Sequence, residues 1–179
     1  MTGEMPRRAI LALGLVGVVA GCGFQPVYME TATGAPGPAA RNLAAIRVNL
    51  IPDRPGQLLR QALQKRFGGS LEVVPTRYRL AVGYSISGQG IGITSSDIAT
   101  RIRMVGTASW VLTAMNTPQS RITSGSARYM DGIDVFDQQY FAADLDTEAV
   151  QRRMATHLAD DIAMELAAFF RHQAAVTAR

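Results

Sequence analysis

The chain has 179 residues, of which 47% are hydrophobic and 18% are charged, and its formal net charge is +4. This length allows one domain to bury a hydrophobic core without disulfides or metals. A single cysteine excludes a disulfide framework, and the two histidines form no Cys/His cluster of the kind that binds zinc. The composition therefore predicts neither a metal site nor a cofactor site.

The N-terminal segment has the organisation of a secretory signal. Arg7-Arg8 precede the apolar run Ile10–Ala20, and small residues follow it up to Cys22. A charged start, a short apolar stretch and small residues before a cleavage site are typical of a signal peptide. The apolar run is about half of the roughly 20 residues that a transmembrane helix needs. Residues 1–21 are therefore predicted to be cleaved.

Val19-Ala20-Gly21-Cys22 resembles a bacterial lipobox. The resemblance implies that Cys22 is lipidated and becomes the first residue of the mature chain. Several acyl chains give a stable membrane anchor where one does not, because each buried CH₂ contributes about 0.8 kcal/mol. An ordinary signal peptide that ends in cysteine is the alternative. Residues 22–44 are expected to form a flexible tether, because Thr31–Ala40 is rich in Gly, Pro, Ala and Thr.

Residues 45–173 are predicted to form a single domain that begins with a strand and a helix. Ala45–Ile51 alternates apolar and polar residues, as a strand with one buried face does. Gln57–Phe67 follows a helical period, with three large apolar side chains spaced four residues apart. Gly68-Gly69 is expected to end this helix.

Three strand-like segments follow, and then one long helix. The strand-like segments are Arg77–Ser87, Arg101–Met115 and Arg121–Tyr129, and the short turns between them favour antiparallel hairpins. The helix is predicted over Asp144–His172, with Asp144 or Asp146 as its N-cap and a disordered tail at residues 174–179.

The element order β-α-β-β-β-α predicts an α+β fold. We expect a four-stranded, mainly antiparallel sheet with two helices packed on one face, because two amphipathic helices need an apolar sheet face to cover. Side chains alternate between the faces of a strand, so the other face is expected to carry arginine, serine and threonine.

The charges are unevenly distributed along the chain. Residues 41–128 contain 12 basic and 3 acidic side chains, whereas residues 129–179 contain 4 basic and 9 acidic ones. A basic segment is typical of a protein with an anionic partner, such as a phosphate-bearing lipid or an acidic protein surface. The alternative is internal complementarity, in which the acidic C-terminal part packs near the basic middle.

The arginines of the predicted strands are the candidate anion-binding residues, because a guanidinium group binds phosphate in bidentate fashion. Exposed arginines can also serve only to keep a sheet soluble and to block edge pairing. The candidate residues are Arg77, Arg79, Arg101, Arg103 and Arg121.

No catalytic residues are predicted. The glycine-rich Gly88–Gly92 lacks the third glycine and the following helix of a nucleotide-binding loop. Asp160 and Asp161 are neighbours on a helix and point about 100° apart, so they do not form an acid/base pair. Nucleic acid is not expected as a partner of an exported lipoprotein.

The segment Cys22-Gly23-Phe24-Gln25-Pro26-Val27-Tyr28 and the element order together resemble the LptE family of lipopolysaccharide-assembly lipoproteins. The resemblance implies an α+β fold anchored at the periplasmic face of the outer membrane. It also implies a partner, the β-barrel LptD, whose lumen the lipoprotein plugs while it assists insertion of lipopolysaccharide into the outer leaflet. Gly23 in place of aspartate resembles the pattern that permits sorting to the outer membrane.

Two other functions are compatible with the same residues. One is a different periplasmic adaptor lipoprotein, such as an auxiliary subunit of a lipid transporter or a pilotin-like chaperone. The other is a lipid-anchored hydrolase, which is less favoured because no serine lies in a nucleophile-elbow context.

Overall fold

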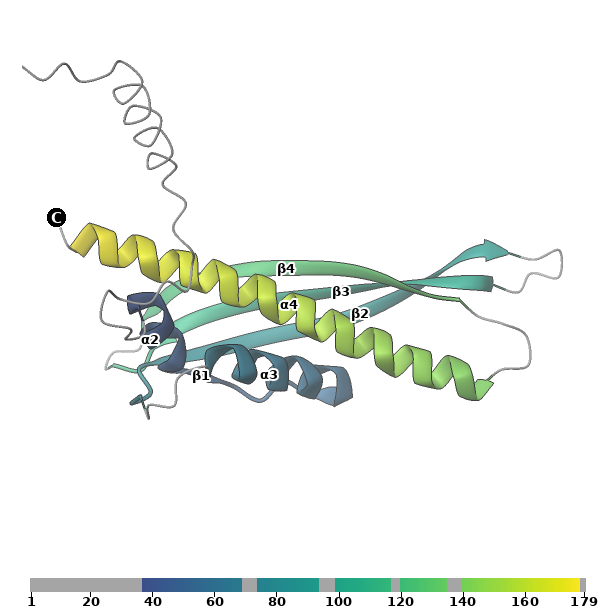
Figure 1. Cartoon of the computed structure of the whole chain (residues 1–179), viewed down its shortest axis with the longest axis horizontal. Coiled ribbons are helices and arrows are strands. Elements are labelled where there is room, and N and C mark those ends of the chain that lie inside the picture. Colours follow the sequence, from purple (N-terminus) through teal and green to yellow (C-terminus); the bar gives the residue numbers. More distant parts are fainter. Residues whose placement is uncertain (1–36, 69–73, 94–98, 117–119, 135–139, 178–179) are drawn as a thin grey trace, which may run out of the picture.

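The structure is a computed structural model that describes residues 37–68, 74–93, 99–116, 120–134 and 140–177. A long twisted sheet carries a layer of helices on one face (Figure 1). Cys22, the signal peptide and residues 22–36 of the expected tether lie outside the described residues. In chain order the elements are α2 (Pro38–Ala44), β1 (Ile46–Val48), α3 (Asp53–Phe67), β2 (Tyr78–Ile93), β3 (Ala99–Ala114), β4 (Arg121–Asp134) and α4 (Tyr140–Thr177).

The sheet has the spatial order β1-β2-β3-β4, so every strand lies beside its neighbour in sequence. The strands β2, β3 and β4 pair antiparallel, whereas the short β1 pairs parallel with β2. Parallel neighbours need a crossover connection, and α3 provides it. The predicted α+β fold with a mainly antiparallel sheet is confirmed.

The core lies between the sheet and the helix layer. The α3 side chains Leu59, Leu63 and Phe67 are buried there, as their spacing predicts. The strands contribute alternate residues such as Leu80 and Leu112. The long stripe of α4 is also buried and consists of Val150, Met154, Leu158, Ile162, Leu166 and Phe170.

A short helix, α2, occupies residues that were expected to belong to the tether. Pro38 stands in its first turn, where a fixed φ and a missing N–H cost nothing. Ala39 and Leu43, four residues apart, are 3% and 1% exposed and join the main core. Two apolar side chains at helical spacing thus outweigh the Gly/Pro/Ala-rich composition on which the tether prediction depended.

The helix α4 is longer than its sequence pattern predicts at both ends. It begins at Tyr140, so Asp144 and Asp146 lie within the helix and do not cap it. It continues to Thr177 rather than ending near His172, because the alanines of the expected tail favour helix. At 38 residues it is about 57 Å long. Within the described part of the chain, no helix combines the length and apolar character needed to span a membrane.

Candidate functional site

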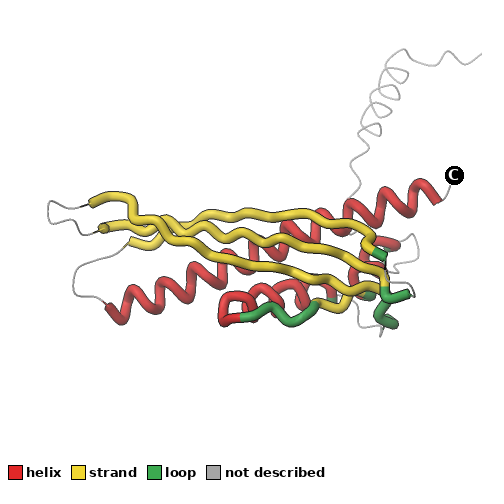
Figure 2. The backbone as a smooth tube through the Cα atoms, turned by 180° about the vertical axis from the view of Figure 1, so that it is seen from behind, coloured by secondary structure: helices red, strands yellow, loops and turns green. Residues whose placement is uncertain are grey.

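One face of the sheet is not covered by any helix of the described residues. Figure 2 shows all the helices on the far side of the strands, which leaves the near face uncovered. Alternation places mostly small or hydroxyl-bearing residues along the middle of this face. They include Ala81, Gly83, Ser85, Thr107, Ser109, Ser124 and Ser126. We refer to this surface as the uncovered face.

Arginines form a row across the uncovered face near α2. Arg47 of β1 lies directly opposite Arg79 of β2, which lies opposite Thr113 of β3, and Thr113 lies opposite Arg121 of β4. We refer to Arg47, Arg79 and Arg121 as the α2-end cluster. The predicted candidates Arg79 and Arg121 therefore lie in one row, together with Arg47, which was not among the predicted candidates.

An irregularity in β4 determines where Arg121 points. The register between β3 and β4 shifts between Leu112 and Thr113, so β4 contains one extra residue there. Residues three apart on a regular strand point to opposite faces, but the bulge places Arg121 and Ser124 on the same face. The Arg121 guanidinium donates a hydrogen bond to the Ser124 hydroxyl.

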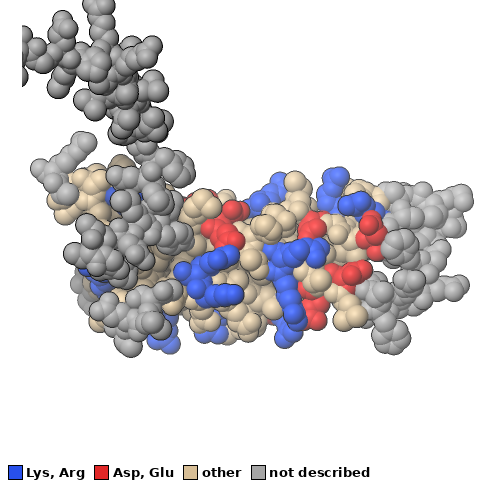
Figure 3. All heavy atoms as spheres, in the orientation of Figure 1, with Lys and Arg blue, Asp and Glu red and all other residues tan. Residues whose placement is uncertain are grey.

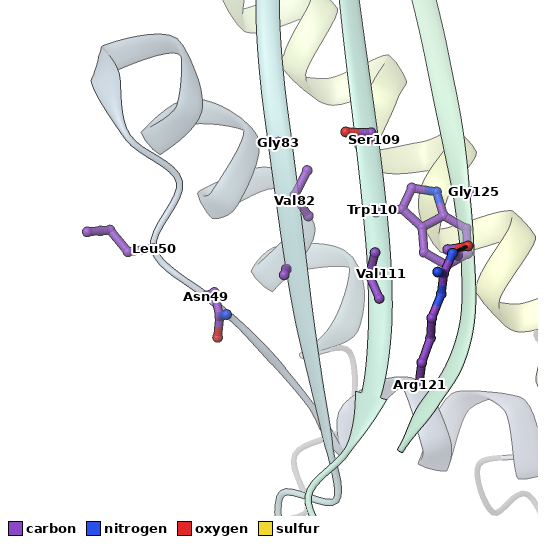
Figure 4. A pocket seen from close by; sticks show the side chains of 11 residues that line it. Asn49, Leu50, Val82, Gly83, Ser109, Trp110, Val111, Arg121 and Gly125 are labelled. Atoms are coloured by element: carbon purple, nitrogen blue, oxygen red, sulfur yellow. Dashed lines mark hydrogen bonds between the residues drawn. The ribbon is translucent and has the colours of Figure 1, made fainter. Parts of the chain in front are cut away.

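A shallow hollow of about 470 Å³ lies beside this cluster (Figure 4). Asn49 and Leu50 border it where the chain leaves β1, and Arg121 borders it on the β4 side. Its floor is formed by small residues such as Gly83 and Ser109. The hollow thus extends across three strands, from the exposed apolar side chain of Leu50 to the guanidinium group of Arg121.

The second cluster lies at the end of the sheet near the β2–β3 hairpin. Arg101 and Arg103 both project from β3 onto the uncovered face, and we refer to them as the hairpin-end cluster. A hollow of about 680 Å³ is lined by these two arginines together with Ile91 and Met130. Two guanidinium groups beside apolar side chains can bind an anion together with an apolar chain that is attached to it.

Of the described strand arginines on the uncovered face, Arg101 alone forms an ion pair with an acidic side chain. Its Nη1 lies 3.6 Å from Oδ1 of Asp134, and both side chains are 57% exposed, so the pairing is weak. Its side chain also lies over Gly132, where a Cβ would come within 3.2 Å of the guanidinium Nε. The absence of a side chain at position 132 therefore leaves room for Arg101 along the sheet surface.

The five predicted arginines do not form one patch. The two clusters are separated by the ten residues from Arg103 to Thr113, or about 33 Å. Arg77 belongs to neither cluster, because its Nη2 donates a 2.8 Å hydrogen bond to Oδ1 of Asn42 in α2. Arg128, which lies opposite Thr107 on the uncovered face, is a further exposed arginine that the weak strand pattern of β4 concealed.

On the helix side of the molecule, several arginines form ion pairs with acidic residues. Basic and acidic side chains lie next to one another over α3 and α4 (Figure 3). Arg54 pairs with Glu148 at 2.9 Å, and Arg66 contacts both carboxylate oxygens of Asp160. These two pairs tie both ends of α3 to α4, which is the internal complementarity that the charge distribution suggested.

The arginine contacts lower the pKa values of two carboxylates, those of Glu148 and Asp131. Hydrogen bonds from Arg152 and Arg54 lower the pKa of Glu148 below its ordinary value. Burial alone would raise the pKa of Asp131, but hydrogen bonds from Arg153 and from the Gly132 N–H, with the positive charge of Arg153, lower it overall. Arg153 Nε lies 2.9 Å from Oδ2 of Asp131, so this pair joins α4 to β4.

The uncovered face therefore combines unpaired guanidinium groups, hydroxyl side chains and shallow apolar hollows. Between the described residues, no ion pair joins Arg47, Arg79 or Arg103 to an acidic side chain. Such a surface suits non-covalent binding of anionic or amphiphilic partners. The fold is thus a helix-backed sheet whose polar face is a candidate binding surface.

The family follows from comparison with known proteins. The model of the lipopolysaccharide-assembly family LptE matches residues 43–166, and the chain belongs to this family. It is thus a non-enzymatic lipopolysaccharide-assembly lipoprotein, and the hydrolase alternative is excluded. Among curated proteins, none matches this sequence significantly.

Solved structures of bacterial lipoproteins share the fold. A lipoprotein of Caulobacter crescentus CB15 is 22% identical with a TM-score of 0.60, and the match covers 74% of this chain and 96% of that one. Rare lipoprotein B of Shewanella oneidensis is 10% identical with a TM-score of 0.54, over 72% and 96%. A lipoprotein B of Nitrosomonas europaea is 12% identical with a TM-score of 0.51, over 69% and 81%. These identities establish similarity of fold.

Proposed function

We propose that the chain is anchored in the periplasmic leaflet of the outer membrane through lipidated Cys22. In this proposal it plugs the lumen of the LptD β-barrel and assists the insertion of lipopolysaccharide into the outer leaflet. Membership of the LptE family supports this role. The lipid anchor would confine the protein to the membrane surface and raise its effective concentration near a membrane partner.

We further propose that arginines of the uncovered face contact the phosphates of lipopolysaccharide. The single observation that carries this proposal is a contrast within the described residues: Arg54, Arg66 and Arg153 on the helix side pair with carboxylates, whereas Arg47, Arg79 and Arg103 on the sheet do not. Arg47 and Arg79 lie directly opposite each other, a like-charge arrangement that costs stability in the unliganded sheet. An anion between them would remove that cost.

The hairpin-end cluster is the better candidate for the amphiphile. Its hollow places Arg101 and Arg103 beside Ile91 and the 57%-exposed Met130. Phosphate would be held by the guanidinium groups while an acyl chain lies along the apolar side chains. Hydroxyl residues in the middle of the face are suited to the aqueous lumen of a barrel.

The test is a double charge reversal, Arg101→Glu with Arg103→Glu, assayed for lipopolysaccharide binding. We expect affinity to fall at least about tenfold, since each charged hydrogen bond contributes roughly 1.5–3 kcal/mol. The matched control is Arg41→Glu with Lys65→Glu, which makes the same change in charge at exposed positions on α2 and α3. Equal losses in both variants, or unchanged binding in the first, would contradict the arginine proposal.

The anchor and the barrel need separate measurements. Palmitate should label the wild-type chain and not Cys22→Ser. Affinity purification from outer membranes should recover an LptD-type barrel with the wild-type chain. Recovery of an inner-membrane transporter in its place would favour the adaptor alternative.

A further inference from the structure

Among the described residues, no strand pairs with most of the outer edge of β2. The strand β1 pairs only with Tyr78–Leu80, and the last bond of this ladder runs from the Asn49 N–H to the Leu80 carbonyl. Beyond it the chain turns away toward α3, as Figure 2 shows. From Ala81 to Ile93 no described strand pairs with this edge, a length of about 43 Å.

The direction of the free backbone groups follows from that last bond. Because the Leu80 carbonyl points outward, every second residue after it also points its N–H and carbonyl outward. The register with β3 is continuous over this stretch, so the alternation is kept. The outward groups belong to Val82, Tyr84, Ile86, Gly88 and Gly90.

This edge lacks the features by which proteins prevent strand pairing. Leu80–Ile93 contains no charged side chain and no proline. Edge strands are usually blocked by charges, proline, bulges or short length. The opposite edge of the same sheet, β4, has both charged residues and a bulge. Within the described part of the chain, β2 is therefore the one edge of this sheet that lacks such protection.

We infer that the β2 edge accepts an extended, uncharged segment of another protein as an added strand. Main-chain hydrogen bonds would provide affinity, and pockets for alternate side chains would provide selectivity. The hollow of about 470 Å³ lies where β1 ends, with the 73%-exposed Leu50 on its border. It receives one side chain of the added strand.

A single strand fits this edge better than a second copy of the chain. An added strand needs about 4.8 Å beside the edge. The helix α3 lies along the first half of the edge, and the N-terminal end of α4 extends past it (Figure 1). A second copy would bring its own helices into that same layer. The inference does not depend on LptD being the protein that contributes the strand.

The experiment places a photo-crosslinking amino acid, p-benzoylphenylalanine, in the full-length lipoprotein in cells. The test position is Ser85 on β2, and the matched position is its register partner Thr107 on the central strand β3. Both side chains lie on the uncovered face, but only Ser85 borders the open edge. We expect an adduct from position 85 whose crosslinked peptide is an uncharged segment of another protein, and no adduct with that same segment from position 107.

Pairing through main-chain hydrogen bonds at this edge is tested by two changes at one residue. Gly88→Pro deletes an outward N–H, whereas Gly88→Ala keeps it. A Cβ at position 88 would lie 3.4 Å from Cγ2 of Ile102, an ordinary contact, so alanine is tolerated. Loss of one hydrogen bond and the bulk of the ring should lower the adduct yield about tenfold in the proline variant. The alanine variant should keep the wild-type yield.

Four outcomes would overturn the inference: no adduct, an adduct with a second copy, equal adducts with the same segment from both positions, or equal yields from the two Gly88 variants. Circular dichroism and thermal unfolding check that each variant folds. If the proline variant does not fold, Ser87→Lys charges the same edge and should give the same loss. Recovery of an LptD-type barrel is measured in the same samples, so failure of the proposed partner is distinguished from failure of strand addition.

Discussion

The two sides of this molecule use the same residue type for different purposes. On the helix side, Arg54, Arg66 and Arg153 each bind a carboxylate that another element of the fold contributes. On the uncovered face, Arg47, Arg79 and Arg103 have no such partner within the described residues. An arginine count alone cannot distinguish these roles, whereas the location of the acidic residues does.

The difference also appears in packing. The helix-covered face is filled by large apolar side chains that are almost entirely buried, and the uncovered face has mainly small and hydroxyl residues. Stability should therefore depend on the first face and binding on the second. Variants that change neighbouring residues on opposite faces test this division.

The largest effect is expected from Leu112→Ala. Leu112 is 0% exposed on the covered face, and truncation of such a residue costs about 2–5 kcal/mol of unfolding free energy. The adjacent Val111 faces the other way, so Val111→Ala should cost about 1 kcal/mol or less. Urea denaturation measures both, and similar losses would contradict the division between the faces.

Gly125→Ala should have the next largest effect. A Cβ there would lie 2.6 Å from Cζ2 of Trp110 and 2.9 Å from Oε2 of Glu165. Forcing these groups apart should cost about 1–3 kcal/mol. The control is Gly83→Ala on the uncovered face, where the nearest atom is the movable Ser109 hydroxyl at 3.2 Å. A thermal melt in which Gly83→Ala lowers stability more than Gly125→Ala would contradict the close packing of Trp110 against Gly125.

Charge reversal should separate the two kinds of arginine. Arg66→Glu breaks a two-point contact with Asp160 and places like charges together, at a cost of about 1 kcal/mol. Arg79→Glu breaks no ion pair within the described residues and relieves repulsion from Arg47. Its unfolding free energy should stay within about 0.5 kcal/mol of wild type. A larger loss in Arg79→Glu than in Arg66→Glu would show that the sheet arginines are structural.

The smallest effect concerns the pH dependence of Asp131. Because its pKa is lowered in the folded chain, the associated stability is present above its ordinary value of 3.8 and is lost as pH falls through the lowered value. Arg153→Ala should raise the folded pKa, so that this loss occurs at higher pH. Carboxyl NMR titration of Asp131 in the wild type and in the variant measures the midpoint. An unmoved midpoint would exclude Arg153 as the cause.

Several parts of the fold could be predicted from sequence because their physics is local. The four-residue spacing of Leu59, Leu63 and Phe67 determines which side of α3 is buried. Strict alternation in β2 and β3 determines which face of the sheet is apolar. The existence of α2 was missed because it depends on packing of Ala39 and Leu43 against distant elements. The C-terminal extension of α4 was missed for a different reason, because the helix propensity of its alanines was not given enough weight.

The candidate site could also be predicted from sequence only in part. Alternation correctly placed Arg79, Arg101 and Arg103 on the face without helices. It did not show that about 33 Å separates the two clusters, because that distance follows from the hairpin register. The role of Arg77 was also hidden, since its hydrogen-bond partner Asn42 belongs to a helix that composition did not predict.

The sequence by itself determined the alternation that divides this sheet into an apolar and a polar face, because the period of a strand is an intrinsic property of the backbone. Only the tertiary structure decided which arginines are neutralised and which edge of the sheet stays open. Ion pairs and strand neighbours join residues far apart in the chain, and their geometry exists only once the helices have packed.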